Sequence, residues 1–290
     1  MVPGDPGQCT GERRSVCPVN HVLWIGGPPG SGKTTIARRL ARRHGMRLYS
    51  ADTRTWAHRD RALDARVGSA ERWESLAHAD RWDFAPEQLV EMSLQRERGP
   101  MVIEDIQALP EVPLIVAEGT TVPAWALSSG LAERARAVWL MPTIEFQERQ
   151  LAERGTLDGP AALYRSLRDV AERDARAHDV ATLTIDGALD VSRTVVRIER
   201  LFADALSAGP LATTRRERHQ LLREMNEAIV DQVRGYYARP WADGDADAVT
   251  SHFVCECARA DCDAEVQVTV GAVSAGPVVA VGHREPSWPD

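Results

Sequence analysis

Eight residues near the N-terminus of the chain, from Gly27 to Thr34, match the pattern G-x-x-x-x-G-K-[ST]. Glycines in such a segment let the backbone curl so that successive N–H groups point at a phosphate chain, and the N-terminus of a following helix adds a partial positive charge. The ammonium of Lys33 can then reach the β- and γ-phosphates of a nucleotide, and the hydroxyl of Thr34 can ligate Mg²⁺. The sequence therefore predicts an ATP-binding loop, which we expect to consist of Gly27, Gly30, Ser31, Gly32, Lys33, Thr34 and Thr35.

Lys33 is the only lysine among the 35 basic residues of the chain. The composition of the chain favours arginine over lysine at every other basic position, so the lysine at position 33 is an exception. Arginine could not act here as a compact point charge, because its guanidinium is a wide planar fork. The surviving lysine thus favours a phosphate site over the alternative, a chance turn that is rich in Gly and Pro.

Asp52, in the segment YSADT, follows Lys33 and ends the second apolar run of the chain. A carboxylate at the carboxyl end of a strand beside the loop strand would point into the crevice where a phosphoryl acceptor must lie. We therefore expect Asp52 to activate the acceptor; the alternative is that it caps the following helix. Trp56, His58 and Arg59 come next and could line the acceptor pocket, although Trp and His at helical spacing are more often packed in a core.

Five short apolar runs, separated by helical patterns, must position these groups. The runs are residues 21–26, 47–52, 113–119, 137–142 and 181–187. A helix pattern from Thr34 to His44, ended by Gly45, follows the first run. The helix after the last run repeats the apolar residues Val191, Val195, Ile198 and Leu201. This alternation predicts an α/β fold with a three-layer arrangement, in which about five parallel strands carry helices on both faces.

The loop, YSADT and the run LIVAEG (114–119) resemble P-loop small-molecule and nucleoside-monophosphate kinases, including shikimate kinase-like, chloramphenicol phosphotransferase-like and zeta-toxin-like enzymes. The segment PTIEFQ (142–147) resembles a poorly characterised group of bacterial P-loop kinases that also carry AEG after the third strand. The resemblance covers about residues 21–207 and implies a P-loop NTPase fold. It gives Glu118 the Walker B position, where an acid holds Mg²⁺ or contacts the acceptor. A second acidic pair, Glu104 and Asp105, is flanked by a continuing helix pattern, which favours Glu118.

The resemblance also implies a mobile lid whose arginines close over the phosphates and offset the charge that develops during transfer. We expect Arg149 and Arg154 to have this role, followed by Arg173. Further candidates are Arg165, Arg168 and Arg176. In a chain so rich in arginine, any one of these residues is more often a solvated surface residue.

A break at residues 207–210 separates the kinase-like part, residues 21–207, from the rest of the chain. Thr214 and Glu217 form a capping-box pattern for a helix that carries Leu221, Met225, Ile229 and Val233 and is expected to end near Gly235. We expect residues 208–241 to be a connecting helix and residues 242–290 to form a small β-rich, cysteine-containing module. Residues 1–20 show no periodicity and are expected to be a disordered tail that includes Cys9 and Cys17.

Three cysteines lie within eight residues, and a histidine follows them. Three thiolates and an imidazole make a complete tetrahedral zinc set without an open position for catalysis, so we expect a structural zinc site. Its ligands would be Cys255, Cys257, Cys262 and His283. Buried free thiols are the alternative, and His252 could replace His283 as fourth ligand. The module also resembles a small C-terminal domain of bacterial proteins of unknown function, which implies no activity.

The composition of the chain bears on its partners and its cellular compartment. The net charge of −7 and the sequence pI near 5.7 make nucleic acid an unlikely partner. The chain has no apolar run long enough for a membrane span and no apolar core of a signal peptide, so we expect a cytoplasmic protein that does not bind membranes. Five cysteines, an odd number, fit a reducing compartment.

The leading hypothesis is an ATP-dependent, Mg²⁺-requiring kinase that transfers the γ-phosphoryl group to a hydroxyl of an unidentified small molecule. The alternative is a nucleotide-dependent switch or ATPase whose cysteine-containing module binds a protein or nucleic acid partner.

Overall fold

The central sheet has five parallel strands in the order β2-β3-β1-β4-β5. In this computed structural model, which describes residues 20–285, the strands are β1 (Val22–Gly26), β2 (Arg47–Ser50), β3 (Ile115–Gly119), β4 (Ala137–Pro142) and β5 (Ala181–Ile185). Each strand lies within one of the five predicted apolar runs. The register pairs Gly26 with Gly119 and Ser50 with Glu118, so the carboxyl ends of the three neighbouring strands meet at one edge. Residues 1–19 of the predicted tail, with Cys9 and Cys17, lie outside the described residues.

Helices cover both faces of the sheet, as predicted. One face packs against α1 (Lys33–His44), α9 (Val191–Leu201), α10 (Ala203–Ala208) and α11 (Arg215–Tyr237). The other packs against α5 (Gln95–Ala108), α6 (Val122–Ser128) and α8 (Asp158–His178). On α9, Val195 and Ile198 are buried, whereas Val191 and Leu201 at the two ends of the helix stay exposed.

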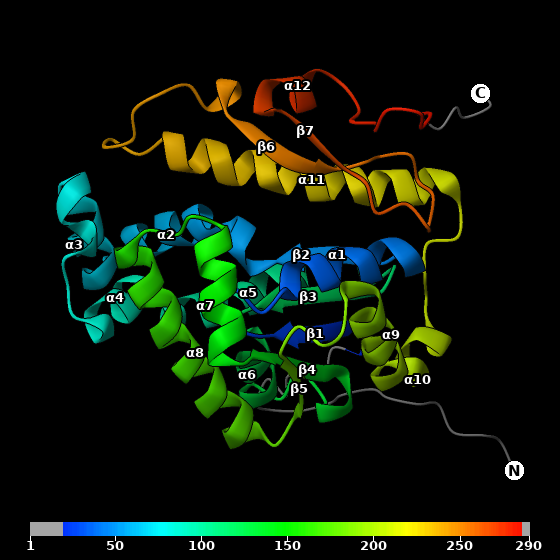
Figure 1. Ribbon diagram of the computed structural model, residues 1–290, viewed down its shortest axis with the longest axis horizontal. Coiled ribbons are helices and arrows are strands. Elements are labelled where there is room, and N and C mark those ends of the chain that lie inside the picture. The colour runs from blue at the N-terminus through cyan, green and yellow to red at the C-terminus, as the bar shows by residue number, and fades with distance from the viewer. Residues whose placement is uncertain (1–19, 286–290) are drawn as a thin grey trace, which may run out of the picture.

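A group of short helices lies at one end of the molecule (Figure 1), near the carboxyl edge of the sheet. It consists of the 3₁₀ turn η1 (Ala51–Arg54), α2 (Thr55–Asp64), α3 (Gly68–Ser75), η2 (His78–Trp82) and α4 (Pro86–Met92). Trp73, Leu89 and Met92 of this group form a separate core with Leu163 and Leu167 of α8. The 3₁₀ turn η3 (Arg134–Arg136) leads into β4, and α7 (Ile144–Glu153) follows it.

The long helix α11 begins with the predicted capping box. Thr214 Oγ1 accepts from the backbone N–H of Glu217 at 3.2 Å, and the backbone N–H of Thr214 donates to Glu217 Oε2 at 3.0 Å. The helix continues past Gly235 to Tyr237, so the predicted end near Gly235 was two residues early. Gly235 lies inside the helix, where the missing side chain makes room for Trp56 of α2.

The C-terminal part contains a two-stranded antiparallel sheet, as expected of the small module. Strands β6 (Thr250–Val254) and β7 (Glu265–Thr269) are preceded by η4 (Ala246–Ala248) and followed by α12 (Val270–Ala275). In Figure 1, α11 lies between this unit and the central sheet, and it packs against β2 on one side and β6 on the other. Buried Asn226 of α11 donates to the carbonyl of Val254 and accepts from its N–H, both at 2.9 Å.

None of the described helices is both long and apolar enough to cross a bilayer.

Candidate functional site

The predicted nucleotide loop connects β1 to α1. Gly27, Gly30 and Gly32 have φ values of 149°, 88° and 79°, a backbone region that favours glycine. A Cβ at Gly27 would also lie only 2.5 Å from the backbone oxygen of Leu140. The buried hydroxyl of Ser31 has no hydrogen-bond partner among the described residues. The loop therefore leaves the first-turn N–H groups of α1 and one buried hydroxyl for an anion.

Lys33 lies between two carboxylates at the start of α1. Its Nζ donates to Asp52 Oδ2 at 3.1 Å and is 3.6 Å from Glu118 Oε2. Burial alone would lower the pKa of Lys33, but the charges of Asp52 and Glu118 raise it above its ordinary value. Lys33 therefore keeps its positive charge in the site.

Glu118 is the penultimate residue of β3 and is fully buried. Thr34 Oγ1 donates to Glu118 Oε1 at 3.1 Å, and the Ser50 hydroxyl donates to the same oxygen. Glu118 Oε2 has no hydrogen-bond partner within the described part of the chain. Burial raises the pKa of Glu118, and Asp52 adds to the shift. A threonine hydroxyl beside a carboxylate with an unused oxygen fits Mg²⁺, which prefers oxygen ligands.

Asp52 lies in η1, directly after β2, and its side chain is 53% exposed. Its carboxylate faces Lys33, and the N-cap residue of α2 is Arg54, whose side chain makes no capping hydrogen bond. Partial desolvation in the site would raise the pKa of Asp52, but Lys33 and Arg98 hold it below its ordinary value. Asp52 is therefore an ionised carboxylate beside the loop, which favours the acceptor role over the capping alternative.

The competing acidic pair lies on α5, as its helix pattern indicated. Arg61 pairs with both Glu104 and Asp105, and Asp105 also accepts from Tyr49 at 2.8 Å. His58 hydrogen-bonds with the same carboxylate at 2.9 Å, so His58 belongs to this network.

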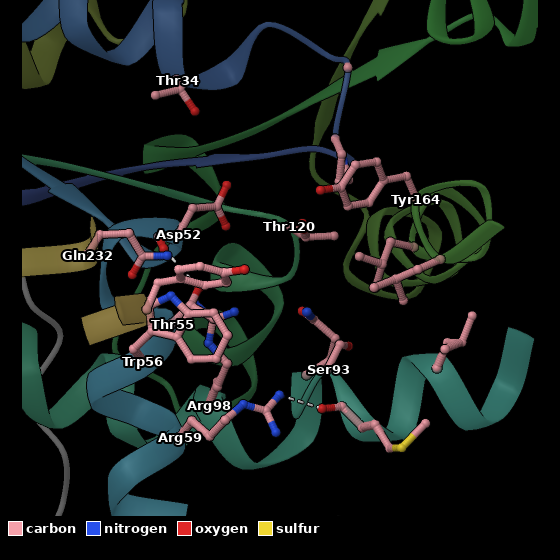
Figure 2. A pocket seen from close by; sticks show the side chains of 18 of the residues that line it. Thr34, Asp52, Thr55, Trp56, Arg59, Ser93, Arg98, Thr120, Tyr164 and Gln232 are labelled. Atoms are coloured by element: carbon pink, nitrogen blue, oxygen red, sulfur yellow. Dashed lines mark hydrogen bonds between the residues drawn. The ribbon is translucent and has the colours of Figure 1, made fainter. Parts of the chain in front are cut away.

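A cavity of about 550 Å³ opens beside Lys33 and Asp52 (Figure 2). Trp56 and Arg59, predicted as lining residues, line it, whereas His58 does not. Sequence reasoning missed most of the remaining wall, which includes Trp73, Arg81, Trp82, Arg98, Tyr164, Gln232, Tyr236 and Trp241. The available signal was composition, since the chain has eight Trp but only four Phe and four Tyr, and three of these Trp fall between residues 56 and 82.

The predicted lid arginines separate in space. Arg154, at the end of α7, lines the cavity and lowers the pKa of Asp52 together with Lys33 and Arg98. Arg149 stacks 5.1 Å from the ring centre of Phe146, and neither it nor Arg173 of α8 is among the described lining residues. The further candidates Arg165, Arg168 and Arg176 contact Glu148, the Pro142 carbonyl and Glu172. The lid role of Arg149, Arg154 and Arg173 stays a prediction.

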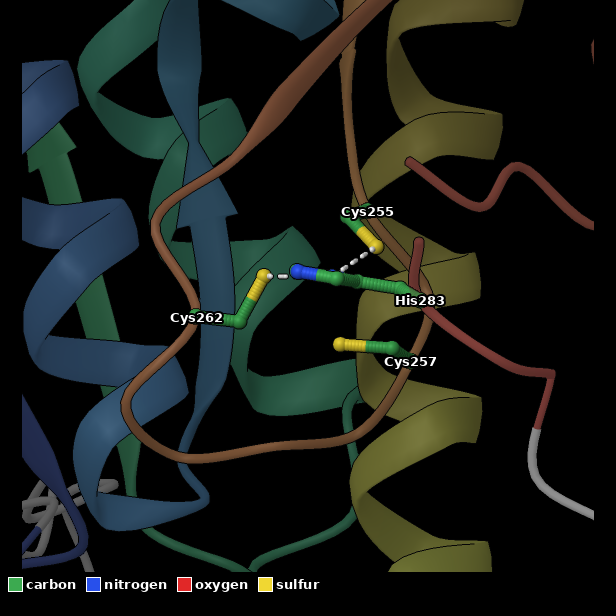
Figure 3. Close-up of side chains that lie close together, drawn as sticks. All are labelled: Cys255, Cys257, Cys262 and His283. Atoms are coloured by element: carbon green, nitrogen blue, oxygen red, sulfur yellow. Dashed lines mark hydrogen bonds between the residues drawn. The ribbon is translucent and has the colours of Figure 1, made fainter. Parts of the chain in front are cut away.

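The three cysteines and His283 come together as expected (Figure 3). His283 Nδ1 lies 3.4 Å from Cys255 Sγ and 3.6 Å from Cys262 Sγ, and the four ligand atoms, including Cys257 Sγ, are all within 4.8 Å of one another. This arrangement fits a tetrahedral metal ion with three thiolates and one imidazole. The alternative ligand His252 lies on β6 and is not part of the cluster.

Two kinds of solved structure share the arrangement of this chain only loosely. A shikimate kinase from Acinetobacter baumannii in complex with shikimate is 19% identical, with a TM-score of 0.39, and the match covers 63% of this chain and 93% of that one. A deoxyadenosine kinase from M. mycoides is 11% identical, with a TM-score of 0.39, and the match covers 63% of this chain and 99% of that one.

Two curated relatives that match this chain are both named tRNA dimethylallyltransferase. A tRNA dimethylallyltransferase from Sorangium cellulosum is 29% identical over 232 residues, which are 77% of this chain and 69% of the relative. A tRNA dimethylallyltransferase from Nitratidesulfovibrio vulgaris is 29% identical over 174 residues, and this chain spans only about half, 53%, of that relative's length.

The family model described as an AAA domain matches residues 22–159, which contain the loop, Asp52 and Glu118. Together with the five-stranded parallel sheet and the conformation of the loop, this match shows that the chain has a P-loop NTPase fold.

Proposed function

We propose that this protein is an ATP-dependent phosphotransferase that moves the γ-phosphoryl group of ATP to a hydroxyl of a small molecule. The observation that carries the proposal is the position of Asp52, whose carboxylate contacts Lys33 of the nucleotide loop and also lines the 550 Å³ cavity. The Asp52 carboxylate therefore lies next to the expected phosphate position and next to the space for an acceptor.

The loop and Lys33 would hold the phosphate chain, with Lys33 exchanging its contacts to Asp52 and Glu118 for contacts to phosphate oxygens. Thr34 and Glu118 would hold Mg²⁺, which when bound offsets negative charge on the phosphates. Arg154 and Arg98 add positive charge on the cavity side of Asp52.

Asp52 would accept the proton of the acceptor hydroxyl while the acceptor oxygen forms a bond to the γ-phosphorus. The bond from the γ-phosphorus to the oxygen that bridges it to the β-phosphorus breaks, and ADP leaves with that electron pair. Asp52 is ionised at neutral pH, as a base must be, because Lys33 and Arg98 hold its pKa below the ordinary value.

The cavity favours transfer to an acceptor over simple hydrolysis. An ATPase or switch needs room for one water molecule, whereas this cavity has aromatic walls and space for a metabolite. A second candidate, transfer of a dimethylallyl group to tRNA, is favoured by the relatives' names and by an alignment that extends over 77% of the chain. The acidic net charge of −7 argues against a nucleic acid substrate.

A metabolite-library screen tests the proposal. ATP consumption is followed with mass-spectrometric detection of products that gain a phosphoryl group, and the Lys33→Ala variant is the control. We expect a phosphorylated product that depends on Lys33. ATP turnover without any such product would favour the switch or ATPase, and labelling of tRNA by a dimethylallyl donor would favour the second candidate.

A further inference from the structure

We infer that the acceptor is a hydroxylated, planar aromatic molecule that carries an anionic group, bound with its ring against tryptophans and its anion on Arg59 and Arg81. The inference rests on the proposed function for the hydroxyl end of the acceptor. The ring and the anion follow from the far wall of the cavity alone.

The far wall alternates aromatic rings and guanidinium groups. Arg59 lies 5.2 Å from the ring centre of Trp73 and 5.9 Å from that of Trp56. Arg81 lies 3.8 Å from the ring centre of Trp241. All five of these side chains line the cavity. Such flat faces suit a planar ring, which can stack on either a tryptophan or a guanidinium.

The guanidinium groups of Arg59 and Arg81 each have N–H donors that make no hydrogen bond to the described residues. Arg59 is 4% exposed and Arg81 is 1% exposed, so water has little access to them. Arg59 donates from Nη2 to the Met92 carbonyl at 2.7 Å, and Arg81 donates from Nε to the Trp73 carbonyl at 3.2 Å. The Nε and Nη1 of Arg59 and both terminal nitrogens of Arg81 have no hydrogen-bond partner among residues 20–285. Buried charged donors without partners are costly, and a bound carboxylate or phosphate would satisfy them.

The neighbouring carboxylates do not balance these arginines. Glu74 Oε1 is 4.0 Å from Arg59 Nε and 3.8 Å from Arg239 Nη1, and Glu74 Oε2 accepts from Trp241 at 2.6 Å. Asp60 pairs with Arg239 at 2.7 Å. In the described part of this cluster, three guanidinium groups thus face two carboxylates. Burial lowers the pKa of Arg59 to about 10 despite Glu74, which is the response of a cation that lacks counter-charge.

The ends of the cavity differ in chemistry. In Figure 2, Asp52 lies between Thr34 and Trp56, and Arg59 lies further along, beyond Trp56. A bound molecule can therefore present its hydroxyl to Asp52, lay its ring along Trp56 and direct its anion to Arg59 and Arg81. Gln232 of α11 adds a buried Oε1 that has no described partner and can accept from an N–H or O–H of the ring.

Two kinds of molecule share this chemistry: an aromatic hydroxy acid and a nucleoside monophosphate. The first arm of the test compares 4-hydroxyphenylacetate with its methyl ester, and the second compares AMP and CMP with adenosine and cytidine. Binding to the full-length protein is measured by calorimetry with ADP and Mg²⁺ present, and phosphorylated products are measured with ATP. We expect anions of at least one arm to bind about tenfold or more tightly than their neutral partners.

Variants separate ligand binding from a purely structural role of the cluster. Arg59→Met and Arg81→Met should abolish the preference for the anion and leave ADP binding unchanged. Arg239→Met is the matched control, because Arg239 stacks on Trp56 at 5.2 Å in the same cluster without lining the cavity, and it should keep the preference. Melting temperatures show whether each variant is folded.

The possible results distinguish a failure of the inference from a failure of the proposed function. Equal binding of anionic and neutral partners, no binding in either arm, or loss of the preference in Arg239→Met alone would overturn the inference. An anionic aromatic that binds through Arg59 and Arg81 but never gains a phosphoryl group would confirm the ring and anion contacts and contradict the proposed phosphotransferase.

Discussion

Gly235 of α11 lies against Trp56 of α2 so closely that a Cβ at Gly235 would be 2.9 Å from the Cβ of Trp56. This contact brings α11 to the cavity, to which it contributes Gln232 and Tyr236. The cavity is therefore built by residues 22–159, which the family model matches, together with residues beyond them.

The first prediction concerns this contact. Gly235→Ala should lower the free energy of unfolding and weaken acceptor binding, because the methyl group displaces Trp56, even though alanine in a helix interior normally gains about 0.5–1 kcal/mol over glycine. Gly68→Ala in α3 is the control, since its Cβ would meet no described atom within 4 Å. Thermal melts and acceptor titrations check both; a Gly235→Ala protein as stable as Gly68→Ala would show that the contact is not tight.

The second prediction concerns Asp52. Asp52→Asn should reduce phosphoryl transfer by about 10²- to 10⁴-fold, the usual contribution of a general base, while ATP binding stays within about twofold. Asp64→Asn, at the exposed last residue of α2, should leave both unchanged. Steady-state rates and nucleotide titrations are the measurements, and normal turnover by Asp52→Asn would exclude it as the base.

The third prediction is a pH dependence of stability without ligands. The folded-state pKa of Glu118 is raised by burial, so above its ordinary value of about 4.5 the folded state holds a proton that the unfolded state has lost. Stability should therefore fall as pH rises through this window, and Glu118→Gln should remove the fall. Asp52, whose pKa is lowered, acts in the opposite direction and only below about pH 4.

Melting curves from pH 4 to pH 8 on the wild type and Glu118→Gln test this sign. The difference in melting temperature, variant minus wild type, should grow as pH rises. A difference that shrinks over this range would mean that Glu118 is stabilised in its charged form.

The fourth prediction concerns the cysteine cluster. We expect about one zinc ion per chain, lost together with thermal stability in His283→Ala but retained in His252→Ala, because only His283 faces the three thiols. Since β6 packs on α11, and α11 lines the cavity, zinc loss should weaken acceptor binding more than ADP binding. Metal analysis and titrations check this; stoichiometric zinc in His283→Ala would reassign the fourth ligand.

The central sheet and the nucleotide loop were predictable because each rests on local sequence. A parallel strand that is buried on both faces reads as a continuous apolar run, as Trp24 and Trp139 in fully buried β1 and β4 illustrate. The loop motif is contiguous, and the cysteine cluster needed only one distant partner, His283.

The acceptor cavity was not predictable in the same way. Its walls come from Trp56, Trp73, Tyr164 and Trp241, which no spacing rule connects. The apolar stripe of α11 indicated a helix without naming its partners, so we expected a connecting helix, whereas Leu222 and Met225 pack in the core of the central sheet. Gly235 was interpreted as a helix end because glycine is favoured at the C-terminus of a helix. Glycine is also favoured where another residue packs closely against the helix, as Trp56 does here.

The last prediction concerns Arg154 and Arg149, for which the sequence predicted the same lid role. Arg154 lines the cavity and acts on the pKa of Asp52, whereas Arg149 stacks on Phe146 at 5.1 Å. Arg154→Met should therefore lower the rate of transfer by on the order of a hundredfold, because it removes a positive charge from the place where phosphoryl charge develops. Arg149→Met should change the rate less than about threefold, since it lacks access to the cavity in this conformation. Single-turnover rates at saturating ATP measure both; equal losses would mean that α7 moves on ATP binding and brings Arg149 to the phosphates, as the lid hypothesis requires.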